Sequence, residues 1–123
     1  MEAARAIQHG DTAILCANEH QILYEIELRF EDCSTEHEDY MTYWIASHKD
    51  KEVATEMFKV FLNTCKTAFK PEMYEEVVGL YAHPTMIGAV AMKNLEILDL
   101  LKGYIKEADV EEEMIAQYGE TFS

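Results

Sequence analysis

The stretch HQILYEIELRF, residues 20–30, decides between two folds for this chain. From residue 22 to residue 31, apolar side chains alternate with mainly charged ones, which is the pattern of a half-buried strand. A helix through the same region also gathers apolar side chains on one side. The apolar residues on that side are Leu15, Ile22, Leu23, Ile26 and Phe30. The two interpretations lead to different fold classes.

We favour a helix over about residues 12–31. Only Ile22 and Ile26 are β-branched in the stretch, whereas strands concentrate such residues. Asn18 and Gln21 have the spacing of a capping box, and the residues before the stretch contain no glycine turn for a hairpin. No further strand pattern occurs elsewhere, and an isolated hairpin is only marginally stable.

The sequence therefore predicts an all-α fold, a compact bundle of about five to six helices. By its length, the chain is expected to form a single domain over residues 1–123. The alternative is an α+β fold with an N-terminal β-hairpin in residues 12–31. In that case residues 12–17 pair with residues 22–31 and the hairpin packs on the later helices.

Two helices are predicted in the middle of the chain. Asp50 can cap a helix that runs to about Phe69, because apolar side chains recur there every three or four residues. Pro71 stands where a first-turn proline belongs, so a second helix is expected to begin there.

Two more helices are predicted toward the C-terminal end. Pro84 is expected to begin the longest helix, over about residues 85–107, and its wide apolar face predicts a nearly central position. Asp109 and Glu112 have capping-box spacing for a last helix, and Gly119 is a natural end for it.

Composition restricts the environment of the chain. No run of 18 apolar residues occurs, so no membrane span is expected. The first residues lack the apolar segment of a secretory signal. Cys16, Cys33 and Cys65 are odd in number and form no CxxC pair, which favours reduced thiols. A cytoplasmic location follows as the expectation.

The net charge is the strongest compositional feature. Ten basic residues face 24 acidic ones, giving a formal net charge of −14 at pH 7. Such a chain is repelled by nucleic acid and by anionic membrane surfaces, so neither is an expected direct partner. A basic protein, for example one that itself binds nucleic acid, is the favoured partner because opposite charges accelerate encounter. The competing interpretation is that the acidity only keeps the protein soluble.

The sequence contains no pattern of a catalytic or cofactor site that we can recognise. A nucleophile elbow, a phosphate-binding loop and an HExxH pair are all absent. His48, Glu52 and Glu56 stand four residues apart and would share a helix face that could hold a metal. Asp50 is expected to start a new helix between the first two, which argues against that site. We therefore expect no enzyme activity, no cofactor and no metal.

One acidic cluster is accompanied by aromatic residues and is our candidate partner-binding site. Aromatic anchors surrounded by charge are typical of protein interfaces. The candidate residues are Glu31, Asp32, Glu36, Glu38, Asp39, Tyr40, Tyr43 and Trp44. The alternative is that Tyr43 and Trp44 fill the core.

Three functional hypotheses follow. The first is a small acidic non-enzymatic interaction protein that binds or inhibits a basic protein surface, as inhibitors, immunity-type proteins or nucleic-acid mimics of this size and charge do. The second is a helical structural or oligomerising subunit, for example a homodimer, that uses the apolar faces of residues 85–107 and 110–118. The third is a metal-binding helical-bundle protein.

Overall fold

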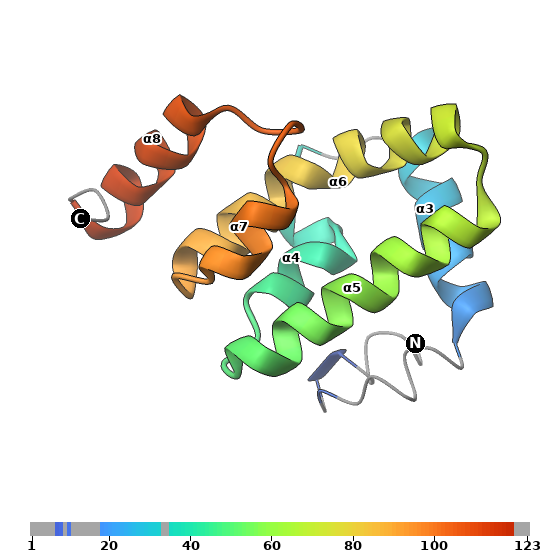
Figure 1. Cartoon of the computed structure of the whole chain (residues 1–123), viewed down its shortest axis with the longest axis horizontal. Coiled ribbons are helices and arrows are strands. Elements are labelled where there is room, and N and C mark those ends of the chain that lie inside the picture. The colour runs from blue at the N-terminus through green and yellow to red at the C-terminus, as the bar shows by residue number, and fades with distance from the viewer. Residues whose placement is uncertain (1–6, 9, 11–17, 33–34, 120–123) are drawn as a thin grey trace.

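The computed structural model describes residues 7–8, 10, 18–32 and 35–119 of the chain (Figure 1). These residues contain six α-helices and one short 3-10 helix, and no strand, so the prediction of an all-α bundle of five to six helices is confirmed. The elements are α3 (Glu19–Glu31), η1 (His37–Asp39), α4 (Met41–Ala46), α5 (Lys51–Ala68), α6 (Pro71–Ala91), α7 (Leu95–Leu100) and α8 (Glu107–Tyr118).

The stretch that separated the two interpretations is helical. It forms α3, in which Ile22 and Ile26 are buried while Tyr24 is 55% exposed. A strand would have placed these three side chains on one face, whereas the helical period of 3.6 residues turns Tyr24 away from the other two. The second strand of the hairpin alternative, residues 22–31, is therefore wrong. Residues 12–17 lie outside the described residues.

Helices α5 and α6 form an antiparallel pair joined by a short turn at Phe69 and Lys70 (Figure 1). The Asp50 side chain caps α5 by accepting hydrogen bonds from the backbone N–H groups of Glu52 and Val53. Pro71 occupies the first turn of α6, where its missing N–H leaves no hydrogen bond unmade. Both start signals therefore act as the sequence predicts.

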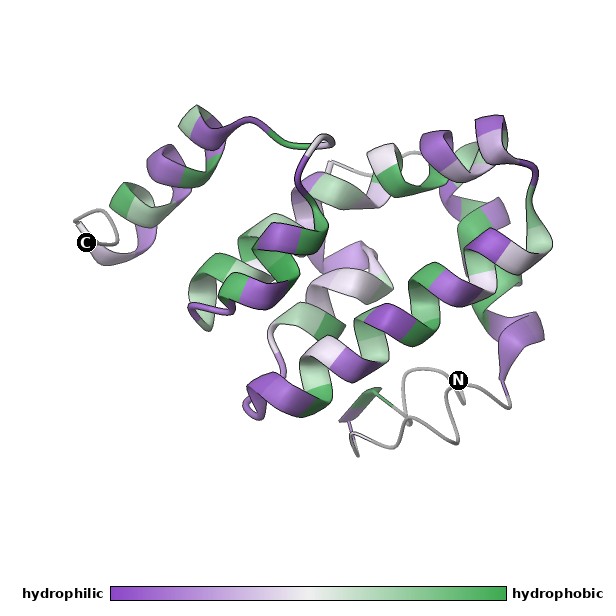
Figure 2. Cartoon of the chain, viewed as in Figure 1, coloured by the Kyte–Doolittle hydropathy of each residue, from purple (hydrophilic) through white to green (hydrophobic). Residues whose placement is uncertain are grey.

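Aromatic side chains fill the space between these two helices. The Phe58 and Phe61 rings of α5 stack with centroids 6.2 Å apart, and the Phe61 ring lies 5.1 Å from the Tyr81 ring of α6. All three side chains are almost completely buried. Burying such large rings supplies much of the hydrophobic free energy of a core. Figure 2 shows the resulting pattern as alternating hydrophobic and hydrophilic bands along α5.

The predicted helix over residues 85–107 is wrong, because Pro84 lies inside α6 rather than at its start. The helix continues through the proline, although Pro84 donates no hydrogen bond to the preceding turn. Tyr81 on one side of Pro84 and Met86 on the other are both buried, and this burial offsets the cost of the proline. The hydroxyl of Thr85 donates a hydrogen bond of 2.6 Å to the Tyr81 carbonyl oxygen.

The region predicted as one helix is divided near Asn94, where α6 has ended and α7 begins. Lys93 adopts a left-handed φ of 54°, which ends the turn after α6. The Asn94 side-chain oxygen accepts a 3.1 Å hydrogen bond from Ile97 N–H and so caps α7. Its amide nitrogen donates to the Thr55 hydroxyl at 3.2 Å and to the Lys51 carbonyl at 3.3 Å. These bonds connect the start of α7 to α5.

The last helix, α8, begins at Glu107 rather than at the predicted capping box of Asp109, and no side-chain hydrogen bond caps it. Gly119 ends it with φ 75°, as predicted. Gln117 donates a 3.2 Å hydrogen bond to the Ile87 carbonyl oxygen, so α8 is attached to α6. Figure 1 shows α8 and α3 at opposite ends of the molecule.

The short helix α4 packs against both α5 and α6. Gly88 of α6 allows this close approach, because a Cβ atom there would lie only 2.6 Å from the Tyr43 carbonyl oxygen and 3.1 Å from the Ala46 Cβ. Ile45 and Ala46 are fully buried at this contact. The position of α4 matters for function because this helix carries Trp44.

Candidate functional site

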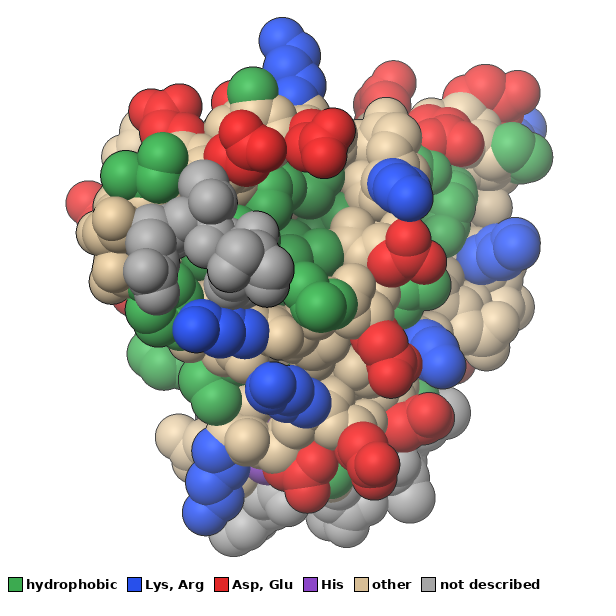
Figure 3. Space-filling model, turned by 60° about the vertical axis from the view of Figure 1, so that its left-hand side comes forward, with side chains coloured by type: hydrophobic (Ala, Val, Ile, Leu, Met, Phe, Trp, Pro, Cys, Tyr) green, Lys and Arg blue, Asp and Glu red, His purple; other side chains and the backbone are tan. Residues whose placement is uncertain are grey.

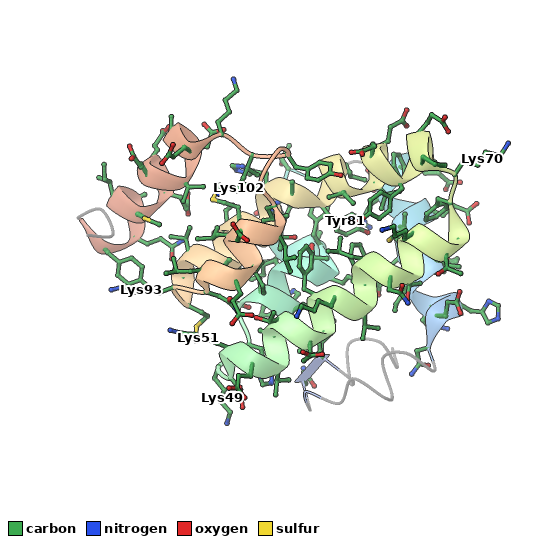
Figure 4. All side chains as sticks on the ribbon, in the orientation of Figure 1. Lys49, Lys51, Lys70, Tyr81, Lys93 and Lys102 are labelled. Carbon is green, nitrogen blue, oxygen red and sulfur yellow. The ribbon has the colours of Figure 1, made fainter. Side chains whose placement is uncertain are left out.

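Nearly all carboxylates in the described part of the chain point into solvent. Only Glu25 and Glu113 are partly buried, and the other described Asp and Glu residues are exposed. Figure 3 shows acidic side chains spread over one face of the molecule, with fewer Lys and Arg side chains between them. Ion pairs such as Lys102–Asp99, at 3.5 Å, join exposed side chains and contribute little to stability (Lys102 is labelled in Figure 4). The surface therefore keeps a strongly negative field.

The candidate residues from the sequence lie on three consecutive elements. Glu31 and Asp32 end α3, Glu36, Glu38 and Asp39 lie in and beside η1, and Tyr40, Tyr43 and Trp44 precede or belong to α4. The five carboxylates are exposed. The structure brings Glu38, Asp39 and Trp44 to one cavity, whereas the other five residues do not line it.

The aromatic residues of this set have three different environments. Tyr40 is buried, and its ring meets the Tyr81 ring edge-on at 5.4 Å, so it belongs to the core. Tyr43 is partly buried and contacts the Trp44 ring at 5.0 Å. Trp44 is 50% exposed. Trp44 therefore provides the large aromatic surface that solvent and a partner can reach.

The Trp44 ring is held in place by η1. Its Nε1–H donates a 2.8 Å hydrogen bond to the Glu38 carbonyl oxygen. The His37 ring packs on the Tyr43 ring at 4.6 Å, and His37 Nε2 lies 3.0 Å from Glu38 Oε1. Because the indole N–H already has its partner, the exposed part of Trp44 offers ring surface rather than a hydrogen-bond donor.

A cavity of about 500 Å³ opens beside this ring, which is within the usual size range of ligand pockets. Its walls come from the first described residues, from α3, from η1, and from α4 with the two residues that follow it. The described lining residues are Ile7, Gln8, Glu25, Leu28, Arg29, Glu38, Asp39, Met41, Trp44, Ser47 and His48. The cavity thus combines apolar surface with three carboxylates and one guanidinium.

Glu25 is the least solvated carboxylate of this cavity. Burial raises its pKa above the ordinary glutamate value, and the nearby Arg29 guanidinium opposes that rise. On the opposite wall, His48 Nδ1 accepts a 3.1 Å hydrogen bond from the Asp50 backbone N–H. That bond requires an unprotonated Nδ1.

Our sequence interpretation missed the α3 side of this cavity. Glu25, Leu28 and Arg29 are spaced three and four residues apart, so a helix places them on one side. That side differs from the buried side marked by Ile22 and Ile26. The signal was therefore present, but it depends on choosing the helix over the strand.

Metal and thiol chemistry find no support in the described ranges 7–8, 10, 18–32 and 35–119. No group of three or more His, Cys, Asp and Glu residues there is placed to hold a metal ion. Asp50 caps α5 between His48 and Glu52, so those two residues do not share one helix. Burial raises the pKa of the Cys65 thiol to about 12, which keeps it protonated and unreactive.

Comparison with known proteins places the chain in a family but does not supply an activity. Among the described helices, none is both long and apolar enough to cross a membrane. No curated protein and no solved structure matches the chain significantly. A family model described as "Family of unknown function (DUF5903)" matches residues 2–123. Since this match extends over nearly the whole sequence, the chain belongs to the DUF5903 family.

Proposed function

We propose that this chain is a small, acidic, non-enzymatic interaction protein that binds a basic protein surface and blocks it. The observation that carries the proposal is the outward placement of the carboxylates on a chain with a formal net charge of −14. Such a field attracts positively charged partners and repels polyanions. The proposed place of action is the cytoplasm, where a reduced, buried thiol such as that of Cys65 is stable.

The surface from Glu31 to Trp44 is the proposed interface. Its five carboxylates are exposed, and Glu38 and Asp39 line one cavity with Trp44, whose half-exposed ring is a suitable anchor for a partner. Carboxylates of this surface would take the place of nucleic-acid phosphates, with lysines and arginines of the partner as counter-charges. A nucleic-acid-binding groove is therefore the type of basic surface that the proposal favours, as for an inhibitor, an immunity-type protein or a nucleic-acid mimic.

Affinity capture followed by salt titration tests this proposal. The immobilised protein is incubated at low salt with a soluble extract of its native cells, and the retained proteins are eluted by rising salt and identified. A retained protein is then purified, and its dissociation constant is measured from about 0.01 M to about 1 M salt, over which the Debye length falls from about 30 Å to about 3 Å. We expect a basic partner whose affinity falls steeply.

Two charge-matched variants locate the interface. The first replaces Glu36 and Glu38 by Gln and Asp39 by Asn. The second replaces Glu111, Glu112 and Glu113 by Gln, in the separate acidic cluster of α8. Both variants lose three carboxylates, so their net charges are equal. If the surface from Glu31 to Trp44 is the interface, only the first variant should weaken the complex strongly. An affinity that does not change with salt, or an equal loss in both variants, contradicts the proposed interface.

An oligomerising subunit is the second candidate, because several large apolar side chains near the C-terminal end are exposed. Leu95 of α7 is 62% exposed, and Ile115 and Tyr118 of α8 are 54% and 40% exposed. Such side chains favour burial in a contact with another chain or a second copy. Analytical ultracentrifugation tests this candidate. A mass that rises with concentration in the wild type but not in a Leu95→Ser variant supports it, and a constant monomer mass contradicts the homodimer.

A further inference from the structure

We propose that the cavity beside Trp44 binds an arginine side chain of the basic partner. This inference rests on the function proposed above and adds a defined pocket and a defined residue type to it. The pocket is formed by α3, η1 and α4 together with Ile7 and Gln8. Its rim includes Glu38 and Asp39, which belong to the acidic surface from Glu31 to Trp44.

The charges of the cavity walls favour a cation. Among the described lining residues, Glu25, Glu38 and Asp39 carry carboxylates, and Arg29 carries a guanidinium. His48 adds no positive charge in the state that the structure shows, because its Nδ1 accepts a hydrogen bond. An incoming cation therefore meets more negative than positive charge. An incoming carboxylate or phosphate would be repelled by the same walls.

The apolar part of the walls favours a long side chain over a small inorganic cation. Leu28, Met41 and Ile7 offer surface for the methylene groups of a lysine or arginine stem. The volume of about 500 Å³ leaves room for the head group as well as for backbone atoms near the entrance. A metal ion would leave most of this space unfilled.

Trp44 favours arginine over lysine. Its Nε1–H already donates to the Glu38 carbonyl, so the surface that remains for a ligand is the ring itself. A planar guanidinium stacks on an aromatic ring and is more weakly hydrated than an ammonium group, so it leaves water at lower cost. A carboxylate such as that of Glu25 can then accept two parallel N–H donors from the same fork.

The solvation of Glu25 points the same way. Burial raises the pKa of its carboxyl group, so the ionised form lacks the favourable contacts that water would provide. A bound guanidinium would supply them, and the affinity should therefore rise with pH as Glu25 loses its proton. The other charged or titratable groups that face Glu25 are Arg29 on its own helix, Tyr81 of α6 and three residues of the cavity wall. The groups across the cavity are Glu38, Asp39 and His48.

The test uses the full chain and a blocked Gly-Arg-Gly peptide. A matched peptide carries citrulline, which keeps the shape of arginine but has no charge. Trp44 is the only tryptophan, so its emission reports on the cavity directly. We expect a saturable change with the arginine peptide, a weaker response with a lysine peptide, and none with the citrulline peptide.

Three variants separate a binding role from a general charge effect. Glu25→Gln should weaken arginine-peptide binding by about tenfold and flatten its pH dependence. Glu27→Gln removes the same charge from an exposed position of α3 outside the cavity and should leave binding unchanged. Arg29→Gln should strengthen binding, because it removes the cation that competes for the same carboxylates.

The outcomes distinguish this inference from the proposed function. Equal responses to the arginine and citrulline peptides, or equal losses in Glu25→Gln and Glu27→Gln, overturn the arginine pocket. If a basic partner is still retained in a salt-dependent manner in that case, the proposed function stands without the pocket. If the protein retains no basic partner either, both proposals fail.

Discussion

The close packing of α4 on α6 at Gly88 predicts that one substitution has opposite effects at two sites of the same helix. In Gly88→Ala the new Cβ would lie 2.6 Å from the Tyr43 carbonyl oxygen and 3.2 Å from the Ser47 nitrogen. Both are backbone atoms, so α4 itself must move. In Gly79→Ala the new Cβ has no described atom within 4 Å apart from its chain neighbours and the backbone of its own helix.

The magnitudes follow from two general terms. Overpacking lowers the free energy of unfolding by about 1–3 kcal/mol. Because Gly88→Ala must displace backbone atoms, we expect its overpacking cost at the upper end, about 3 kcal/mol. Alanine gains about 1 kcal/mol over glycine inside a helix. We therefore expect Gly88→Ala to lower the free energy of unfolding by about 2 kcal/mol and Gly79→Ala to raise it by about 1 kcal/mol.

Urea unfolding followed by far-UV circular dichroism measures both changes. Emission from Trp44 adds a local readout, because Trp44 belongs to the helix that Gly88→Ala displaces. We expect the folded-state emission to change in Gly88→Ala and to stay constant in Gly79→Ala. If the two variants are stabilised equally, α4 does not approach α6 as closely as described, and the geometry of the Trp44 cavity is then wrong as well.

Three further predictions concern helix caps and pH. Asn94→Ala removes the cap of α7 and its buried hydrogen bonds to α5, so it should lower the free energy of unfolding by about 1–3 kcal/mol in urea titrations; an unchanged midpoint would show that this contact is not made. Asp50→Ala removes a cap that accepts two backbone N–H bonds and should cost about 1 kcal/mol, measured in the same way, and a neutral result would contradict the capping role. Burial raises the pKa of Cys65 to about 12 from its usual value of 9.0, so the unfolded chain loses this proton first. The free energy of unfolding should therefore fall by about 1.4 kcal/mol per pH unit between these two values. Cys65→Ala should show a correspondingly smaller slope, and equal slopes would refute the assignment.

The sequence correctly predicted those helix ends that a single residue determines. Asp50, Pro71 and Gly119 act through their own backbone or side chain, so position in the sequence was sufficient to place them. The prediction of a helix over about residues 12–31 is confirmed from Glu19 to Glu31, where too few β-branched residues and no partner strand were available. These predictions needed no knowledge of tertiary contacts.

The failures occur where tertiary packing overrides a local preference. Pro84 looked like a helix start, but burial of Tyr81 and Met86 on either side favours one continuous helix through it. Asn94 falls inside the helix predicted over residues 85–107, but its amide is buried against Thr55, which is 39 residues away in the sequence, and it starts a separate helix. No pattern in the sequence could show that distant partner.

The candidate site was predicted only in part for a similar reason. The acidic residues around Trp44 form a local cluster, so the sequence shows them directly. Which aromatic ring is exposed depends on how α4 is rotated against α5 and α6, and this rotation buries Tyr40 and exposes Trp44. The contribution of Glu25 and Arg29 from α3 requires the packing of a separate helix.

Quenching of Trp44 fluorescence by small ions tests most directly the claim that an exposed aromatic ring lies in a strongly negative field. The ring is 50% exposed, so both caesium and iodide ions can reach it. Each quenching constant is divided by the constant for a free tryptophan derivative in the same buffer, because iodide is the more efficient quencher of indole. We expect this ratio to be far higher for caesium than for iodide at about 0.01 M ionic strength, with the difference shrinking toward about 1 M salt. Equal ratios at low salt, or a higher ratio for iodide, would contradict the account.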